Sequence, residues 1–319
     1  MSWNAREDLR VCLRSIEGGS SRPETVETWV LDNASTDGSA EMVAREFSSV
    51  HLIRSETNRG FSGGNNPLLE NLGADYALLL NSDAVCHPGA FDTLLSWADA
   101  NPKAGIIGPK VLNTDGSLQF SCRRFPTFAA GLFRNVYLGR LFPNNKPAAD
   151  YLMQDFDHAA AREVDWVSGC VLLIRRACLD AIGPLDAETF FMYCEDMDWC
   201  LRAHNADWSV VYAPDAVFTH AIGRSSDHAA ERMIVEHHRS MWRFYKKHQA
   251  FFDPQIPLLL RPLVPVGIVS RVAVRIARRR YINPLLNLLR GGKQPSPSTP
   301  STPPTTSESN VHQASSSTG

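Results

Sequence analysis

The chain has 319 residues, of which 44% are hydrophobic and 21% are charged, and its formal net charge is −2. These values are ordinary for a soluble globular protein of one or two domains. The net charge conceals an asymmetry, because residues 255–293 carry eight Arg and Lys and no Asp or Glu, whereas the body of the chain is acidic. An acidic body argues against a general nucleic-acid binder, and the basic segment is compatible with an anionic membrane surface.

The cysteines and the hydropathy pattern bear on location. The seven cysteines are odd in number and form no CxxC pair, which favours buried free thiols in a reducing compartment over disulfides. No signal peptide opens the chain, and no uncharged apolar run reaches the length of a transmembrane helix. We therefore expect a cytoplasmic protein that lies peripherally at the inner face of the plasma membrane.

Strands alternate with helices in the first part of the chain. The pattern predicts helices at 5–16, 40–47, 68–73 and 89–100, strands at 28–31, 51–54, 76–80 and 104–107, and a glycine-rich loop at 58–66. Such alternation indicates a parallel, doubly wound sheet, in which ligands bind beyond the carboxyl ends of the strands. Asp32 and Asp83 both follow apolar strands, so we expect them at that edge.

The second part is less regular. The pattern predicts an apolar strand within 164–176, a pair of strands at 209–212 and 216–220 joined around Pro214, and a long helix over 228–248. Between them, residues 190–202 place Glu195, Asp196 and Asp198 within four positions among aromatic residues. Acids at the start of a helix suit its dipole, and crowded carboxylates also suit an active site.

The basic segment 255–293 is interrupted early by prolines and is then expected to be helical. Its predicted helix has two faces, one with Arg271, Arg275 and Arg278 and the other with Val269, Val272 and Ile276. This pattern is typical of a helix in a membrane interface, although a helix packed on the protein with a solvated basic face produces it too. The Ser/Thr/Pro-rich residues 294–319 are expected to be disordered.

Several of these side chains carry chemistry when taken together. Asp83 is a hard oxygen ligand suited to Mg²⁺ or Mn²⁺, and His220, which closes another strand, is a candidate second ligand. Each alone is more often a turn residue or a structural histidine. Glu195 and Asp196 supply a candidate general base. A divalent ion with a base, and no evident Ser/His or Cys/His arrangement, suits transfer from a phosphate-activated donor.

Five motifs occur in an order that resembles family 2 glycosyltransferases, most closely their bacterial rhamnosyltransferase branch. They are Trp3-Asn4, Leu31–Ser39, Gly60–Asn66, Leu80–Asp83 and Phe191–Asp198, and Arg123–Pro126 and Asp165–Gly169 add to the likeness, which spans about residues 2–248. The resemblance implies a GT-A fold and inverting transfer of a sugar from a nucleotide diphosphate. We expect L-rhamnose from dTDP-rhamnose, delivered to a lipid-linked or growing polysaccharide acceptor in envelope glycan synthesis. The alternatives are UDP-galactofuranose or UDP-N-acetylglucosamine as donor, or an inactive sugar-nucleotide-binding scaffold.

The resemblance also implies roles for residues at the donor end of the site. Asp32 would contact the nucleobase, and the turn from Asn58 to Gly60 would lie beside the nucleoside. Asn81 and Asp83 occupy the position of the family's DxD motif, with Asp83 and His220 as ligands of Mg²⁺ or Mn²⁺. Arg224 is a weaker candidate for the diphosphate oxygens.

At the acceptor end, Asp196 would be the catalytic base, with Glu195 beside it to raise its pKa by like-charge repulsion. Trp166 and Asp198 are expected to contact the acceptor. No nucleic-acid partner is expected, and the oligomeric state is not predicted.

The expected fold class is α/β, a GT-A type doubly wound mixed sheet flanked by helices, with a C-terminal helical extension. Residues 1–250 would form the catalytic domain, divided into a nucleotide-binding half at 1–110 and an acceptor-binding half at 111–250, followed by the basic extension 251–293 and the tail 294–319. The family's first strand should precede Trp3. We therefore expect a chain that begins late, lacks that strand and has low solubility.

Overall fold

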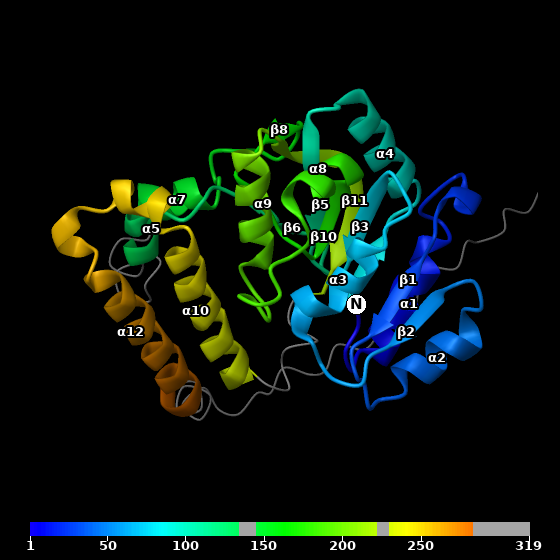
Figure 1. Ribbon diagram of the computed structural model, residues 1–319, viewed down its shortest axis with the longest axis horizontal. Helices are drawn as coiled ribbons and strands as arrows, with labels where there is room; N and C mark the ends of the chain where they lie inside the picture. Colours follow the sequence, from blue (N-terminus) through cyan, green and yellow to red (C-terminus); the bar gives the residue numbers. More distant parts are fainter. Residues whose placement is uncertain (134–144, 222–229, 283–319) are drawn as a thin grey trace, which may run out of the picture. The chain divides into compact units, whose positions relative to one another are not determined.

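The computed structural model describes residues 1–133, 145–221 and 230–282 (Figure 1). The chain divides into two compact units, Met1–Ile276 and Ala277–Gly319, and the first holds every strand of the described residues and the candidate site. Arg224 lies outside the described residues, as do 283–293 of the basic segment and the whole tail.

The larger sheet has seven strands in the order β3-β10-β5-β11-β4, with β6 added beside β5 and β8 beside β11. Its strands are β3 (Tyr76–Leu80), β4 (Ala84–Cys86), β5 (Ala104–Leu112), β6 (Leu118–Gln119), β8 (Arg162–Glu163), β10 (Val171–Arg175) and β11 (Ser209–His220). β11 runs parallel to β5, whereas β10 runs antiparallel to both β3 and β5. The sheet is therefore mixed, and β3 and β5 are not the parallel neighbours that the first half alone suggests.

Two small sheets complete the strand framework. β1 (Trp29–Asp32) pairs in parallel with β2 (His51–Arg54), and Ser2 forms a parallel bridge with Asp32. β7 (Cys122–Arg123) pairs antiparallel with β9 (Trp166–Val167). In the described part of the chain, the β1–β2 sheet forms no ladder with the larger sheet.

Helices surround the larger sheet in Figure 1, with α9, α8 and α4 next to its labelled strands. The α-helices are α1 (Arg6–Ile16), α2 (Ser39–Glu46), α3 (Gly60–Glu70), α4 (Ala90–Ala100), α5 (Phe128–Phe133), α7 (Lys146–Tyr151), α8 (Arg176–Ile182), α9 (Glu195–Asn205), α10 (Ala230–Lys247), α11 (Gln249–Phe252) and α12 (Leu263–Ala277). Short 3₁₀ turns occur at Pro23–Thr25, Asp253–Gln255 and Leu258–Leu260, and a π-turn at Arg278–Ile282.

Apolar side chains are buried on both faces of the larger sheet. Along β5, Ile106 belongs to one core cluster and its neighbour Ile107 to another. Along β10, Leu172 and Leu173 divide in the same way. Successive strand side chains point to opposite faces, so this sheet has a core on each side, which explains its continuous apolar runs.

Two segments differ from the sequence-based expectation. The glycine-rich segment expected as a loop is the first part of helix α3, which begins at Gly60. Just before it, the Asn58 side chain accepts a hydrogen bond from the Gly60 amide at 2.9 Å. The expected pair of strands around Pro214 is the single strand β11, whose pairing with β5 shifts register between Ala213 and Val217. A bulge accommodates a proline that cannot donate to the ladder.

The C-terminal extension is helical, as expected. No single helix within 1–133, 145–221 and 230–282 is long and apolar enough to cross a membrane. The segments Gln249–Gln255 and Leu258–Ile282 meet the length and composition criteria only as a pair, and they are bent by 116° relative to each other.

Candidate active site

Strand register places the two candidate metal ligands side by side. β11 pairs antiparallel with β4 so that His220 lies opposite Ala84, next to Asp83. The Asp83 carboxylate lies 3.2 Å from His220 Nε2, and the Ala221 amide donates to the Asp83 carbonyl at 3.0 Å. Two residues that are 137 positions apart in the sequence thus meet at one edge of the sheet.

The hydrogen bonds of Gln119 assign a proton to Nδ1 of His220. The Gln119 amide group donates to Asn113 Oδ1 at 3.0 Å and to the His220 carbonyl at 3.2 Å. Its oxygen therefore accepts from His220 Nδ1 at 2.9 Å. The other ring nitrogen, Nε2, faces Asn81 Nδ2 at 3.4 Å and the Asp83 carboxylate, and it presents a lone pair to them when only Nδ1 is protonated.

A lone pair that faces a carboxylate is favourable only when a proton or a cation lies between them. Imidazole nitrogen and carboxylate oxygen are both ligands of Mn²⁺, and the carboxylate also suits Mg²⁺. The residues therefore fit a divalent ion. Because no group of three or more His, Cys, Asp or Glu ligands occurs among the residues that the structure describes, water or a bound phosphate would supply the remaining ligands.

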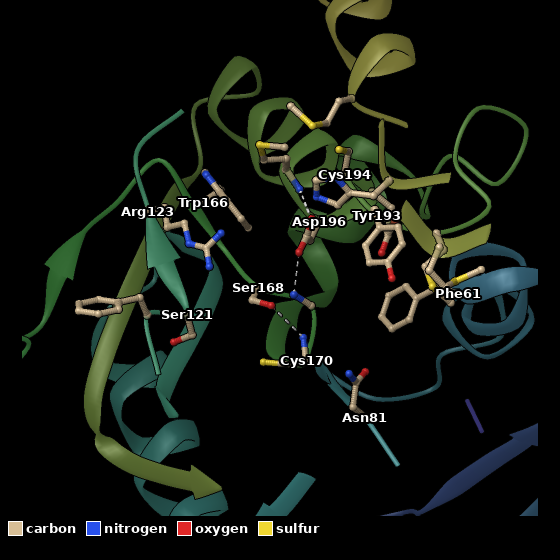
Figure 2. A pocket seen from close by; sticks show the side chains of 18 of the residues that line it. Phe61, Asn81, Ser121, Arg123, Trp166, Ser168, Cys170, Tyr193, Cys194 and Asp196 are labelled. Carbon is tan, nitrogen blue, oxygen red and sulfur yellow. Dashed lines mark hydrogen bonds between the residues drawn. The ribbon is translucent and has the colours of Figure 1, made fainter. Parts of the chain in front are cut away.

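Asp83 and His220 line a cavity of about 1170 Å³ that also contains Glu195 and Asp196. Its lining includes Asn58 and Asn81 from the first half of the chain, β7 and β9 from the second half, and residues of α10 and α12. Figure 2 shows the Asp196 carboxylate between Trp166 on one side and Tyr193 on the other. Three of the predicted donor residues, Asn58, Asn81 and Asp83, thus share one cavity with the predicted acceptor residue Trp166.

Backbone geometry directs Asp196 into the cavity. Tyr193 and Cys194, just before α9, have positive φ angles of 71° and 67°. Side-chain-bearing residues rarely adopt this conformation, and such strain commonly marks functional sites. The Asp196 carboxylate accepts hydrogen bonds from the Gly169 amide at 3.1 Å and the Met197 amide at 2.8 Å, which hold it in one orientation (Figure 2).

The adjacent carboxyl groups of α9 have different environments. Burial raises the pKa of Asp196, but the Gly169 and Met197 amides and the charge of Arg123 oppose this rise. Burial and the charges of Asp196 and Asp198 raise the pKa of Glu195 well above its ordinary value. Glu195 Oε2 has no hydrogen-bond partner in the described part of the chain. Glu195 is therefore the more readily protonated of the two carboxyl groups, and Asp196 is the more readily ionised.

Asp198 has a different function in the same turn. Its side chain is fully buried and pairs with Arg202 at 2.9 Å, Lys247 at 2.7 Å and His248 at 2.7 Å. Burial opposes ionisation, but the His248 hydrogen bond and the charges of Arg202 and Lys247 lower the pKa of Asp198. It is not among the residues that line the cavity. This geometry favours a role in joining α9 to the end of α10, rather than the predicted contact with an acceptor.

Trp166 forms part of the cavity wall, as the predicted acceptor contact requires. Its indole donates to the Arg124 carbonyl at 3.0 Å. Arg123, its register partner across the β7–β9 ladder, places a guanidinium 5.2 Å from the Trp166 ring and 5.9 Å from the Tyr151 ring. Arg123 Nε has no partner among the residues placed by the structure, so it is available to a ligand.

The sequence reasoning missed Arg123 as a site residue. The Arg123–Pro126 motif added to the family likeness, but it did not place Arg123 in the site, because the pairing of two-residue strands that positions it is non-local.

The nucleotide residues lie at the first strand and the start of α3. Asp32 is 4% exposed; one carboxylate oxygen accepts from the Ser35 amide at 3.1 Å, and the other has no partner within the described residues. That oxygen can accept a hydrogen bond from a base. Asn58 lines the cavity, whereas Asp32 and Gly60 lie outside its lining.

Gly60 is required by packing. It has φ of 71°, and a Cβ atom there would lie 2.1 Å from the carbonyl oxygen of Phe191. The Phe61 amide donates to the same carbonyl at 2.7 Å. This close approach connects the start of α3 to the segment that leads into α9, and only glycine permits it.

Comparison with known proteins agrees with this geometry. The family profile described as "Glycosyltransferase like family 2" matches residues 1–239. The chain is 30% identical over 303 residues to N-acetylglucosaminyl-diphospho-decaprenol L-rhamnosyltransferase of Mycobacterium tuberculosis, covering 91% of this chain and 96% of that protein. It is 27% identical over 141 residues to rhamnosyltransferase WbbL of Escherichia coli, covering 44% of this chain and 50% of that one.

Two solved structures share the fold. The mannosyltransferase PcManGT from Pyrobaculum calidifontis, in complex with GDP-Man and Mn²⁺, has a TM-score of 0.52 at 17% identity, covering 91% of this chain and 77% of that one. Staphylococcus aureus TarS 1–349 has a TM-score of 0.50 at 14% identity, covering 86% and 80%. This chain belongs to glycosyltransferase family 2 and is a rhamnosyltransferase-like enzyme with a mixed α/β fold of GT-A type and a C-terminal helical extension.

Proposed function

We propose that this enzyme transfers L-rhamnose from dTDP-rhamnose, with inversion, to a lipid-linked sugar acceptor. The observation that carries the proposal is the single cavity, in which the Asp196 carboxylate, oriented by backbone amides, shares space with the Asp83–His220 pair. The M. tuberculosis relative, which is named for transfer of L-rhamnose to a decaprenyl-diphosphate-linked N-acetylglucosamine, supports the choice of donor and acceptor.

Asp196 is the base in this proposal. Its carboxylate takes the proton of the acceptor hydroxyl as that oxygen attacks the anomeric carbon, and the bond from this carbon to the diphosphate oxygen breaks on the opposite side. Burial raises its pKa toward that of a useful base, and two backbone amides keep it oriented. Glu195, whose pKa is raised well above its ordinary value, is protonated in this proposal, so it does not repel the neighbouring Asp196 carboxylate.

The donor end holds the nucleotide. Asp83 and His220, with Asn81 beside them, would hold Mg²⁺ or Mn²⁺, which when bound neutralises charge on the diphosphate. The unpaired oxygen of Asp32 would accept a hydrogen bond from the base, and Asn58 would lie against the nucleoside. Arg224 stays a proposed diphosphate ligand.

The direct test is product formation from a panel of nucleotide sugars. The purified chain is incubated with Mn²⁺, N-acetylglucosaminyl-diphospho-polyprenol and dTDP-L-rhamnose, UDP-galactofuranose or UDP-N-acetylglucosamine in turn. We expect a rhamnosylated lipid whose new linkage has the anomeric configuration opposite to that of the donor. Transfer from a UDP-sugar alone would overturn the proposed donor, and retention of configuration would overturn the proposed base.

A further inference from the structure

The C-terminal extension leaves large apolar side chains in solvent. The exposed fractions are 72% for Leu258, 89% for Leu259, 51% for Leu263, 60% for Val266 and 67% for Val269. These residues belong to the turn Leu258–Leu260 and to one face of α12. Such a concentration of exposed apolar residues in one short segment marks an interaction surface.

The same segment carries positive charge without acidic residues. From 255 to 293 there are eight Arg and Lys and no Asp or Glu. Apolar residues interspersed with cations complement an anionic lipid surface, where the apolar face enters the acyl boundary and the cations meet the headgroups. A protein partner would need acidic and apolar residues in a matching arrangement, whereas an anionic bilayer supplies both features along its whole surface.

The other face of α12 belongs to the cavity. Arg271 and Arg275 line the same cavity as Asp196, and Arg271 donates a hydrogen bond to the Gly131 carbonyl of α5. His238 of α10, which is 1% exposed, lines the cavity with them. Burial lowers the pKa of His238, and the charges of Arg275 and Arg271 lower it further.

His238 presents an unpartnered nitrogen at this corner. Its Nδ1 lies 2.7 Å from the Ile234 carbonyl and donates to it, so Nε2 carries the lone pair. Nε2 is buried and has no hydrogen-bond partner among residues 1–133, 145–221 and 230–282. A phosphate oxygen at this corner would favour protonation of Nε2 and receive a hydrogen bond from it, beside two guanidinium groups that suit phosphate.

One helix therefore has an apolar face toward solvent and guanidinium groups toward the catalytic cavity. We infer that α12 binds the acceptor at the membrane. Its apolar face lies in an anionic bilayer, and Arg271, Arg275 and His238 bind the diphosphate of a lipid-linked acceptor. This inference rests on the proposed function for the identity of the acceptor. In this arrangement the lipid stays in the membrane, the diphosphate lies at the α10–α12 corner, and the sugar reaches Asp196.

Membrane docking is tested by cosedimentation of the full chain with vesicles of phosphatidylcholine, with and without phosphatidylglycerol. We expect binding to the anionic vesicles and at least about tenfold weaker binding for the double variant Leu259→Glu/Val266→Glu. The control Val11→Glu makes one such substitution at an apolar residue of α1 that is 53% exposed, and the single variant Leu259→Glu is its matched counterpart. Unchanged binding of the double variant, equal binding to both vesicle types, or resistance to alkaline carbonate extraction would overturn surface docking.

The diphosphate site is tested with two acceptors in detergent. Arg275→Gln should raise KM at least about tenfold for N-acetylglucosaminyl-diphospho-polyprenol, and should not raise it for a simple N-acetylglucosamine glycoside without phosphate. Arg275→Lys should recover part of the loss. The matched control Arg239→Gln removes an exposed arginine of α10 that pairs with Glu236 at 3.2 Å. Melting temperatures verify that each variant folds.

The outcomes separate the two proposals. An equal KM change for both acceptors, or no change, would overturn the diphosphate site while transfer by the unaltered enzyme supports the proposed function. Absence of transfer by the unaltered enzyme to either acceptor would instead count against the proposed function, and the vesicle experiment still tests α12 as a membrane surface.

Discussion

The two ends of the cavity are built in different ways. At the sheet end, Asp83 and His220 are held by the β4–β11 register and by the Gln119 hydrogen bonds. At the helix end, Asp196 depends on two strained residues before α9 and on amides from two separate segments. At the sheet end, backbone hydrogen bonds between paired strands hold the residues. At the helix end, side-chain ion pairs such as those of Asp198 hold α9 in position.

This difference has a functional meaning. A rigid sheet end suits a donor whose diphosphate is the same in every reaction cycle, and a helix end assembled from α9, α10 and α12 suits an acceptor delivered from a membrane. Substitutions at the helix end should therefore affect proton transfer and stability, and those at the sheet end should affect ion binding.

The largest effect is expected at the base. Asp196→Asn keeps the shape of the side chain and removes its ability to accept the proton, so kcat should fall by about 10²–10⁴-fold. Affinity for the nucleotide sugar, measured by calorimetry, should change little, because Asp196 lies at the other end of the cavity. Near-normal turnover in this variant would refute the assignment.

Asp198 should matter for stability. Asp198→Asn leaves Arg202, Lys247 and His248 without their buried partner, and we expect a loss of about 3 kcal/mol in the free energy of unfolding, measured by denaturant titration. Asp180→Asn is the matched control, because Asp180 pairs with Arg176 at an exposed site and should contribute less than about 1 kcal/mol. Equal losses in the two variants would contradict the positioning role.

Gln119→Leu should weaken the ion site without changing either proposed ligand. The substitution removes the acceptor for His220 Nδ1, so the ring loses its fixed tautomer and orientation. Loss of the hydrogen-bond partner that orients a metal-ligating histidine typically lowers metal affinity by about 10–100-fold. Mn²⁺ titration monitored by electron paramagnetic resonance measures it, and unaltered Mn²⁺ affinity would show that Gln119 does not orient a ligand.

The smallest expected effect is a change in how stability depends on pH. The folded-state pKa of Glu195 is raised above its unfolded value, so the folded state binds the extra proton and stability decreases as pH rises from the unfolded pKa through the folded one. Glu195→Gln removes this contribution and should stabilise the protein above that range, by up to about 1.4 kcal/mol per pH unit crossed. Parallel curves of melting temperature against pH for the variant and the unaltered enzyme would contradict the assignment.

Sequence patterns predicted most of the helices and strands, and they placed Asp83 after one apolar strand and His220 at the end of another, where the structure brings the two together. Their role as metal ligands stays a prediction. The patterns could not predict that β10 lies between β3 and β5, since that pairing is non-local. Glycine is a poor helix former, so the glycines in the first turns of α3 made this segment resemble a loop. Arg123 was missed because its position depends on the pairing of two very short strands.

The α12 pattern was ambiguous for a different reason. Periodicity identifies two faces of a helix but not which face meets the protein. The structure turns Arg271 toward the protein and leaves Val269 exposed, so neither alternative applies alone.

The central claim is that, of two adjacent carboxyl groups, Glu195 keeps the proton and Asp196 is the ionised base. The most direct test is the dependence of kcat on pH for Glu195→Gln beside the unaltered enzyme. Because glutamine resembles a protonated glutamate, we expect the kcat of the variant to lie within about tenfold of the original. We also expect its plot of kcat against pH to keep the rise that reports ionisation of Asp196. Loss of activity by about 10²-fold or more, or disappearance of that rise, would show instead that Glu195 is the base.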